Sequence, residues 1–315
     1  MAALQTDGLS KRYDGVAVVD GIDLRVPDHS VYAFLGPNGA GKTTTMKMVL
    51  GLIRPSAGSG SVFGLDIVAD SVDVRRRVGY LPQEPRFYPH MTARETLAFA
   101  AGFFFSGRES RIAARVDEML ELVDLADKAD RPIKSFSGGE MQRLGIAQAQ
   151  IHEPDLLVLD EPAAALDPLG RRDVLAILGR FTEKSTVFYS THILEDVQRV
   201  SDTVCILNEG RVIAQGPIGE VLSGGTDTAY SVTIDGDADS TRSRLLEQQW
   251  VSEVLVSDGG TKLRVTVTDA DVAQAKLQRL LLADQNLIVK EFTRTSANLE
   301  DVFVGLIEGE THDGG

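Results

Sequence analysis

Short apolar runs recur along the first two thirds of the chain, and each run is bounded by glycine or polar residues. A continuous apolar run of about 4–8 residues is typical of a strand that is buried on both faces. Helical patterns separate these runs, so the alternation predicts an α/β domain with a mainly parallel sheet covered by helices. The runs lie at residues 31–35, 78–81, 156–159, 186–191 and 203–207.

The segment before the first of these runs has a different pattern. Residues 4–30 alternate between apolar and polar positions and contain turn dipeptides at 14–15 and 20–21. Alternation with turns of this kind predicts antiparallel strands. A further short strand is expected at residues 60–65.

Residues 84–150 are expected to form a helical subdomain. Residues 90–130 are rich in helix-forming residues, and the apolar residues between 111 and 125 have helical spacing. A second helix of the subdomain is expected to include residues 144–151.

The pattern changes again at residues 223–229, which predict a linker between a first domain, 1–222, and a small second domain, 230–315. The second domain has the order strand, helix, strand, strand, helix, strand. This βαββαβ order is that of ferredoxin-like α+β domains, and a role in dimerisation or regulation is expected for it. Its elements are expected at 230–235, 240–249, 251–256, 262–268, 270–283 and 287–293, with a short helix from Asn298.

A glycine-rich loop joins the first buried strand to a helix. Its glycines allow backbone N–H groups to approach phosphate oxygens without interference from a Cβ atom. Lys42 can then reach the β- and γ-phosphates, and the hydroxyl of Thr43 is suited to bind Mg²⁺. The loop therefore predicts a nucleoside triphosphate site. The residues expected to contact the nucleotide are Gly36, Pro37, Asn38, Gly39, Ala40, Gly41, Lys42, Thr43 and Thr44.

Two carboxylates, Asp160 and Glu161, follow the strand predicted at 156–159. Ligands of parallel sheets collect at the carboxyl ends of the strands. Asp160 can hold Mg²⁺ through water, and Glu161 can orient a water molecule for attack on the γ-phosphate. Two acids that cap the next helix are the alternative interpretation, but adjacent buried carboxylates without a ligand would be costly.

Two weaker signals lie elsewhere in the first domain. The sequence Ser137-Gly138-Gly139 precedes a helix and predicts a second anion site. His192 follows the strand at 186–191, where a lone histidine is as often a core or capping residue as a functional one.

Composition limits the classes of protein to which this chain can belong. It has 315 residues, of which 43% are hydrophobic and 25% charged, so one large and one small domain can fold. No apolar stretch approaches the roughly 18 residues of a spanning helix, and residues 1–15 are not expected to be a secretory signal because they lack an apolar core. A membrane role is therefore expected to require a partner. The net charge of −14 disfavours binding to nucleic acid, and no nucleic-acid partner is expected. The single cysteine, Cys205, is expected in the core of a strand.

Residues 4–222 resemble the ATP-binding subunit of an ABC transporter. The resemblance implies a P-loop ATPase cassette with a RecA-like parallel sheet, an antiparallel β subdomain and a helical subdomain, and it implies ATP and Mg²⁺ as cofactors. The matching motifs are Walker A at 36–44, Walker B at 156–160, the catalytic glutamate at Glu161 and the core of the ABC signature at Ser137, Gly138 and Gly139.

The same resemblance assigns roles to residues that are weak signals by themselves. Tyr13 falls at the aromatic residue that stacks on adenine, and Gln83 at the Q-loop glutamine that couples the site to the membrane subunit. Asp167 falls in the D-loop, and His192 at the switch histidine that contacts the γ-phosphate. The implied catalytic residues are Lys42, Gln83, Glu161 and His192, and the implied Mg²⁺ ligands are Thr43, Gln83 and Asp160.

The chain departs from the family pattern at two places. In the signature, Phe136 stands where the family usually has leucine, and Glu140 stands where it often has glutamine. Before the D-loop, three alanines replace the usual Thr-Ser-Gly. The serine and glycines of the signature are intact, so a working site is expected. The departures concern the fine setting of the dimer interface. The three alanines are Ala163, Ala164 and Ala165.

The resemblance also implies partners. In this family the signature of one subunit faces the phosphate loop of another, which implies a head-to-tail dimer, with itself or with a paralogue, that encloses two ATP molecules. Residues 226–315, including the run 298–303, resemble the C-terminal extension of ABC-2 exporter ATPases. The implied function is ATP hydrolysis that powers export through a separate ABC-2 membrane permease, which would hold the chain at the cytoplasmic face of the membrane. An ABC ATPase that acts on DNA or the ribosome, and a module that senses ATP without hydrolysing it, are the competing interpretations.

Overall fold

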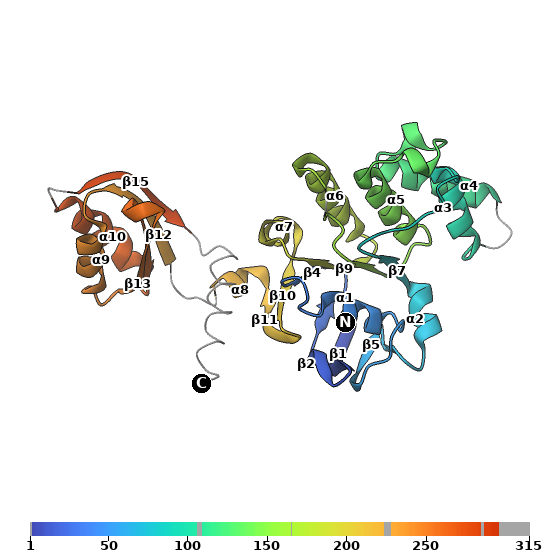
Figure 1. Cartoon of the computed structure of the whole chain (residues 1–315), viewed down its shortest axis with the longest axis horizontal. Coiled ribbons are helices and arrows are strands. Elements are labelled where there is room, and N and C mark those ends of the chain that lie inside the picture. Colours follow the sequence, from blue (N-terminus) through green and yellow to red (C-terminus); the bar gives the residue numbers. More distant parts are fainter. Residues whose placement is uncertain (1, 106–108, 165, 224–227, 285–286, 296–315) are drawn as a thin grey trace. The chain divides into compact units, whose positions relative to one another are not determined.

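The computed structural model describes the chain except residues 1, 106–108, 165, 224–227, 285–286 and 296–315 (Figure 1). The chain divides into two compact units, residues 1–218 and 219–315.

The first unit contains a six-stranded sheet made of β4 (Val31–Leu35), β7 (Val78–Leu81), β8 (Leu156–Leu159), β9 (Thr186–Thr191), β10 (Thr203–Asn208) and β11 (Arg211–Pro217). The strand order is β11-β10-β4-β9-β8-β7. All neighbours pair in parallel except β10 and β11, which pair antiparallel. Every residue of β4, β8 and β9 is buried, which confirms the sheet that the apolar runs predict.

A second sheet of this unit is antiparallel and consists of β1 (Ala2–Tyr13), β2 (Val16–Ile22), β3 (Arg25–Pro27), β5 (Ala57–Val62) and β6 (Leu65–Asp66). The predicted antiparallel strands before residue 30 are confirmed. The predicted turn at 20–21 is wrong, because β2 continues through it with Gly21 at φ 64°. The single strand predicted at 60–65 is also wrong. Phe63 and Gly64 have φ of 47° and 81°, so the chain turns there and returns as β6.

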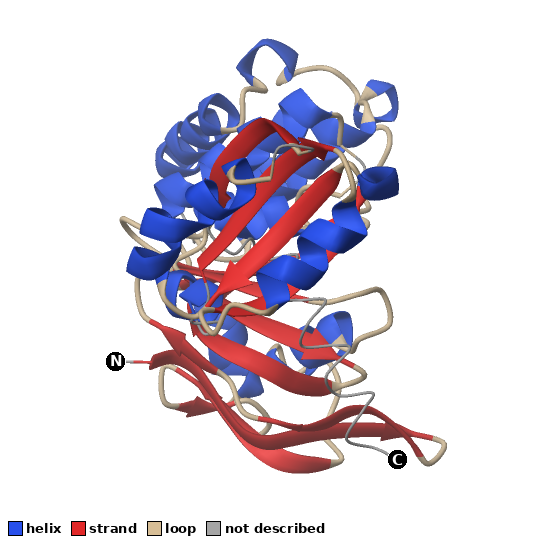
Figure 2. Ribbon diagram, turned by 90° about the vertical axis from the view of Figure 1, so that its left-hand side faces the viewer, coloured by secondary structure: helices blue, strands red, loops and turns tan. Residues whose placement is uncertain are grey.

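The helices of this unit flank the parallel sheet or form the helical subdomain (Figure 1; Figure 2 marks helices and strands by colour). The flanking helices are α1 (Lys42–Val49), α2 (Ser71–Arg77), α6 (Pro168–Phe181) and α7 (Leu194–Val200), and the subdomain has α3 (Ala93–Gly102), α4 (Glu109–Leu122) and α5 (Gly138–Gln150). α4 ends before the predicted residue 125, because Asp124 has a φ of 57°, which a continuing helix cannot contain. Another helix, α8 (Ile218–Ser223), lies at the boundary of the two units.

The second unit has the order β12 (Thr228–Asp235), α9 (Ala238–Leu246), β13 (Val251–Ser257), β14 (Lys262–Val267), α10 (Ala270–Leu282) and β15 (Ile288–Thr295). The strands pair antiparallel in the order β13-β14-β12-β15. Alternate strand residues such as Val232 and Val265 pack on Leu245 and Leu277 of the two helices. The βαββαβ order expected from the sequence is therefore observed, whereas the helix expected from Asn298 and the run 298–303 lie outside the described residues.

Among the described residues, no helix is both long enough and apolar enough to cross a membrane.

Candidate functional site

The phosphate loop joins β4 to α1 at the carboxyl end of the parallel sheet. A Cβ atom on Gly36 would lie 2.4 Å from the carbonyl oxygen of Leu207, and one on Gly41 would lie 2.6 Å from that of Val18. Gly41 also has a φ of 103°. Only glycine fits these two positions, so the loop backbone can pass close to β10 and β2 and still open its N–H groups toward a ligand.

Lys42, the first residue of α1, is buried and points back across the loop. Its Nζ donates hydrogen bonds to the carbonyl oxygens of Gly36, at 2.7 Å, and Pro37, at 3.2 Å. The same atom lies 3.3 Å from Oε1 of Glu161. The ammonium is therefore held at the centre of the loop beside one of the two predicted carboxylates.

The other predicted carboxylate, Asp160, is 1% exposed and accepts two hydroxyl hydrogen bonds. Thr43 Oγ1 donates to its Oδ2 at 2.7 Å, and Ser190 Oγ donates to its Oδ1 at 2.6 Å. The charge of Asp160 also acts on Tyr80, since burial and this carboxylate together raise the pKa of Tyr80 to about 12. Asp160 is thus fixed against Thr43 in the first turn of α1.

Ser190 was not predicted as a site residue. Its hydroxyl also accepts a hydrogen bond of 2.9 Å from the backbone N–H of Glu161, so one side chain positions both carboxylate residues. The available signal is a serine within the buried strand 186–191, two residues before His192. A buried hydroxyl in such a strand needs a hydrogen-bond partner.

Glu161 has a strained backbone and a crowded side chain. Its φ is 50°, which is uncommon for a residue other than glycine and is found preferentially at functional sites. The carboxylate lies beside Lys42, and its two oxygens are 3.1 and 3.0 Å from Nδ1 of His192. The structure therefore brings Lys42, Glu161 and His192 into one cluster.

A cavity of about 260 Å³ is lined by Lys42 and Glu161 of this cluster but not by His192. Gln83, which follows β7, and Glu161 line it together with the phosphate loop and Val18 of β2. Tyr13 does not line the cavity. It is 46% exposed at the end of β1, on the hairpin that carries Val18, with the Nζ of Lys11 5.0 Å from its ring centroid. Loop residues 37–44 all line the cavity.

A second cavity of about 450 Å³ contains the signature and the D-loop. Ser137, Gly138 and Gly139 line it at the start of α5, and Asp167 lines it at the start of α6. Ser137 Oγ accepts a hydrogen bond from the N–H of Glu140, and Asp167 Oδ1 accepts one from the N–H of Gly170. Among the described residues, this cavity shares none of its lining with the phosphate-loop cavity.

The residues that depart from the family pattern have structural partners. Burial alone would raise the pKa of Glu140, but the hydrogen bond from the N–H of Ser137 and the charges of Lys128 and Arg131 give a net lowering. Phe136 is buried, with the guanidinium of Arg131 5.7 Å from its ring centroid. Ala163 is buried, and Ala165 lies outside the described residues.

The oxygen ligands present fit Mg²⁺ in one place. No group of three or more His, Cys, Asp or Glu side chains in the described part of the chain could hold a metal ion alone. Mg²⁺ usually takes one or two protein oxygens and completes its shell with phosphate and water. The hydroxyl of Thr43 and the carboxylate of Asp160, 2.7 Å apart beside the phosphate loop, are suited to that arrangement.

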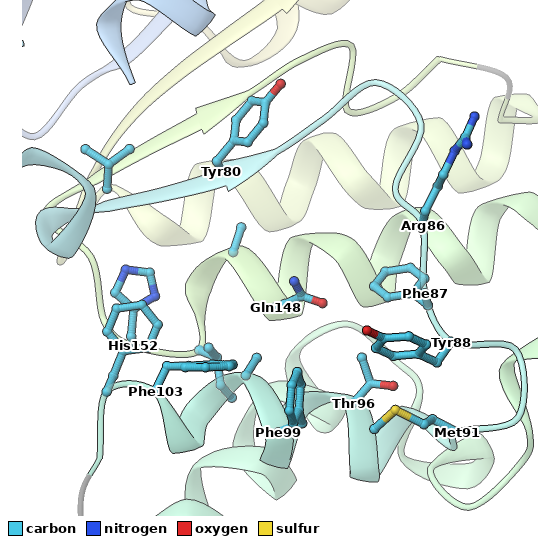
Figure 3. Close-up of a pocket in the computed structure, with 15 residues that line it drawn as sticks. Tyr80, Arg86, Phe87, Tyr88, Met91, Thr96, Phe99, Phe103, Gln148 and His152 are labelled. Carbon is cyan, nitrogen blue, oxygen red and sulfur yellow. The ribbon is translucent and has the colours of Figure 1, made fainter. Parts of the chain in front are cut away.

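An aromatic groove of about 330 Å³ lies between β7 and the helical subdomain (Figure 3). Phe99 of α3 and Phe103, the residue that follows this helix, are 55% and 72% exposed and form an edge-to-face pair with centroids 5.1 Å apart. Tyr88, from the segment that follows Gln83, is 61% exposed. Exposed aromatic side chains gathered around one groove are typical of an interaction surface.

Taken together, a parallel sheet, a glycine-rich loop that leads into a helix, and a lysine, a threonine and two buried carboxylates at the same end define a P-loop nucleoside triphosphatase. The ABC transporter family profile matches residues 19–164. The chain is 34% identical to the daunorubicin/doxorubicin resistance ATP-binding protein DrrA of Streptomyces peucetius, over 96% of this chain and 92% of that protein. It is 33% identical to the bacitracin transport ATP-binding protein BcrA of Bacillus licheniformis, over 98% of both chains.

A solved ATP-binding subunit of an ABC transporter superposes with a TM-score of 0.64 at 30% identity, over 71% of this chain and 93% of the other. The chain therefore belongs to the family of ABC transporter ATP-binding proteins, and its first unit is the ATP-binding cassette.

Proposed function

We propose that this chain is a Mg²⁺-dependent ATPase that powers export of a substrate through a separate membrane permease of the ABC-2 type. The cluster of Lys42, Glu161 and His192 beside the phosphate loop is the observation that carries the ATPase function. The names of the drug-resistance and bacitracin-transport relatives support the export function. The permease would hold the chain at the cytoplasmic face of the membrane.

In this proposal the residues have separate tasks. The loop N–H groups and Lys42 bind the phosphates, and Thr43, Asp160 and Gln83 hold Mg²⁺, which would supply charge stabilisation at the γ-phosphate. Glu161 orients the attacking water and accepts its proton. His192, which is hydrogen-bonded to Glu161, contacts the γ-phosphate, while Tyr13 stacks on adenine from the β1–β2 hairpin.

A head-to-tail dimer would complete each site. Ser137 and Asp167 lie in a cavity separate from that of Lys42 and Glu161, so one chain presents two half-sites. The N-terminus of α5 could stabilise γ-phosphate charge only from the far side of the nucleotide, which requires a second chain.

The aromatic groove of Phe99, Phe103 and Tyr88 is the proposed contact with the permease. Export needs a partner that spans the membrane, and the groove is lined by residues 86–88, which follow Gln83 closely in the chain. Tyr80 lines the groove, and the charge of Asp160 contributes to the raised pKa of Tyr80, so a partner seated there would lie beside a residue that interacts electrostatically with the nucleotide site.

The experiment that tests this function combines phosphate release with copurification. The purified chain should release phosphate from ATP with Mg²⁺ and lose this activity with excess chelator. Coexpressed with its permease, it should copurify, and Phe103→Asp should reduce copurification by roughly 10-fold or more while leaving basal hydrolysis unchanged. Val72→Asp, at a 56% exposed apolar residue of α2, is the control. Mg²⁺-independent turnover would contradict the ATPase mechanism, and normal copurification of Phe103→Asp would contradict the groove assignment.

We also propose that the second unit is a ferredoxin-like domain that holds two cassettes together between cycles. Its element order and strand order support the assignment to that fold. Tethering raises the effective concentration of one cassette around the other, so a chain that ends at Ser223 should hydrolyse ATP more slowly at low protein concentration and recover as concentration rises. Identical sedimentation and identical concentration dependence of the full and shortened chains would rule out this role.

A further inference from the structure

Two segments of the cassette are joined to each other at two points. The first segment runs from Glu161 through Asp167 into α6, and the second runs from His192 into α7. The hydrogen bonds between Glu161 and His192 join them at one end. An ion pair between Arg171 and Asp196 joins them at the other end, with Nε donating to Oδ1 at 2.6 Å.

This ion pair is largely enclosed. The side chain of Asp196 is 5% exposed and that of Arg171 is 25% exposed. Burial raises the pKa of Asp196, the nearby carboxylates of Glu195 and Glu161 act in the same direction, and the guanidinium of Arg171 partly offsets them. The pKa of Asp196 is therefore raised overall, and Arg171 is the partner that opposes the rise.

The ion pair links the D-loop residue Asp167 to helix α7, which the hydrogen bonds of Glu161 do not connect directly. Arg171 lies in the first turn of α6, where its N–H donates to the carbonyl oxygen of Asp167, a residue of the signature cavity. Asp196 lies in the first turn of α7, four residues after His192, which precedes the helix. The side chain of His192 is 43% exposed, and its Nδ1 is hydrogen-bonded to Glu161.

We propose that Arg171 and Asp196 are positioning residues that hold His192 against Glu161 and tie its place to that of the D-loop residue Asp167. A half-exposed histidine with one carboxylate partner needs a second constraint to stay within the small displacement that catalysis tolerates. The ion pair supplies that constraint through α7. A shift of Asp167 at a dimer interface would reach His192 along the same path. This inference rests on the proposed ATPase function.

The test is a double-mutant cycle in the full chain. Arg171→Met removes the cation, and Asp196→Asn removes the charge while avoiding a bare buried carboxylate. Each is made alone and in a His192→Ala background, and Arg172→Met is the matched control. Arg172 is the next residue of the same helix, with a 54% exposed side chain. The measurements are kcat and KM for ATP, the melting temperature and nucleotide affinity.

Positioning predicts that Arg171→Met and Asp196→Asn each lower kcat by about 10-fold with KM changed less than about 3-fold, and that neither lowers kcat further when His192 is alanine. Arg172→Met should behave as wild type. The inference would be overturned if a folded variant had a normal kcat, or if kcat fell equally in the wild-type and His192→Ala backgrounds. If Arg171→Met does not fold, Asp196→Asn tests the inference by the same criteria. If the wild-type chain hydrolyses no ATP, or His192→Ala is fully active, the proposed function of the site fails instead and the inference fails with it.

Discussion

Replacing Glu161 with glutamine is expected to lower the rate of ATP hydrolysis by roughly 10²–10⁴-fold while ATP still binds. The glutamine amide keeps the shape of the side chain and one oxygen that can accept hydrogen bonds from Lys42 and His192. It lacks the negative charge that orients an attacking water and accepts its proton. Glutamate and glutamine are equally compatible with the backbone φ of 50° at this position. The lower rate of hydrolysis would therefore result from the missing carboxylate and not from a changed loop conformation.

The measurement is steady-state phosphate release together with nucleotide binding and sedimentation. ATP-bound dimers of Glu161→Gln should accumulate, because closure on ATP no longer ends in hydrolysis. Glu183→Gln, at an exposed glutamate of the same unit, is the control for removal of one negative charge. Turnover of Glu161→Gln within about 2-fold of the wild type would remove Glu161 from the mechanism.

The strands of the cassette could be predicted because each has a strong local cause. β4, β8 and β9 are buried on both faces, so their sequences are continuous apolar runs. Two of the errors fall where the backbone changes direction. The turn at Phe63 and Gly64 follows from positive φ angles that no periodicity displays, and the same is true of the end of α4 at Asp124.

For the site, sequence reasoning named residues but could not give their contacts. The loop spacing identifies Lys42, and the strand end identifies Asp160 and Glu161. Their link through Ser190 depends on the register between β8 and β9, which sets Leu159 opposite Tyr189 and is fixed by tertiary packing. The pairing of Arg171 with Asp196 joins two helices whose sequences contain no mutual signal, so only the folded chain displays it.

The arrangement of the two half-sites leads to the second large effect. Lys42→Ala removes the cation of the phosphate loop, and Ser137→Arg fills the signature cavity with a bulky cation; each variant alone should lose nearly all ATPase activity. If the signature acts on the nucleotide of a partner chain, mixing the two variants restores activity. A mixed dimer then combines the unmutated Lys42 of one chain with the unmutated Ser137 of the other, so one of its two sites is intact.

Random pairing makes half of the dimers mixed, so activity should recover to at most about a quarter of the wild-type value. Mixing Lys42→Ala chains with chains that carry both substitutions leaves no intact site, and this control should stay inactive. Because Ser137 also caps α5, its loss costs about 1 kcal/mol, so the melting temperature of Ser137→Arg must first show a folded cassette. A folded Ser137→Arg homodimer with full activity would contradict a signature that acts in trans, because both of its sites would then work without the serine of either chain.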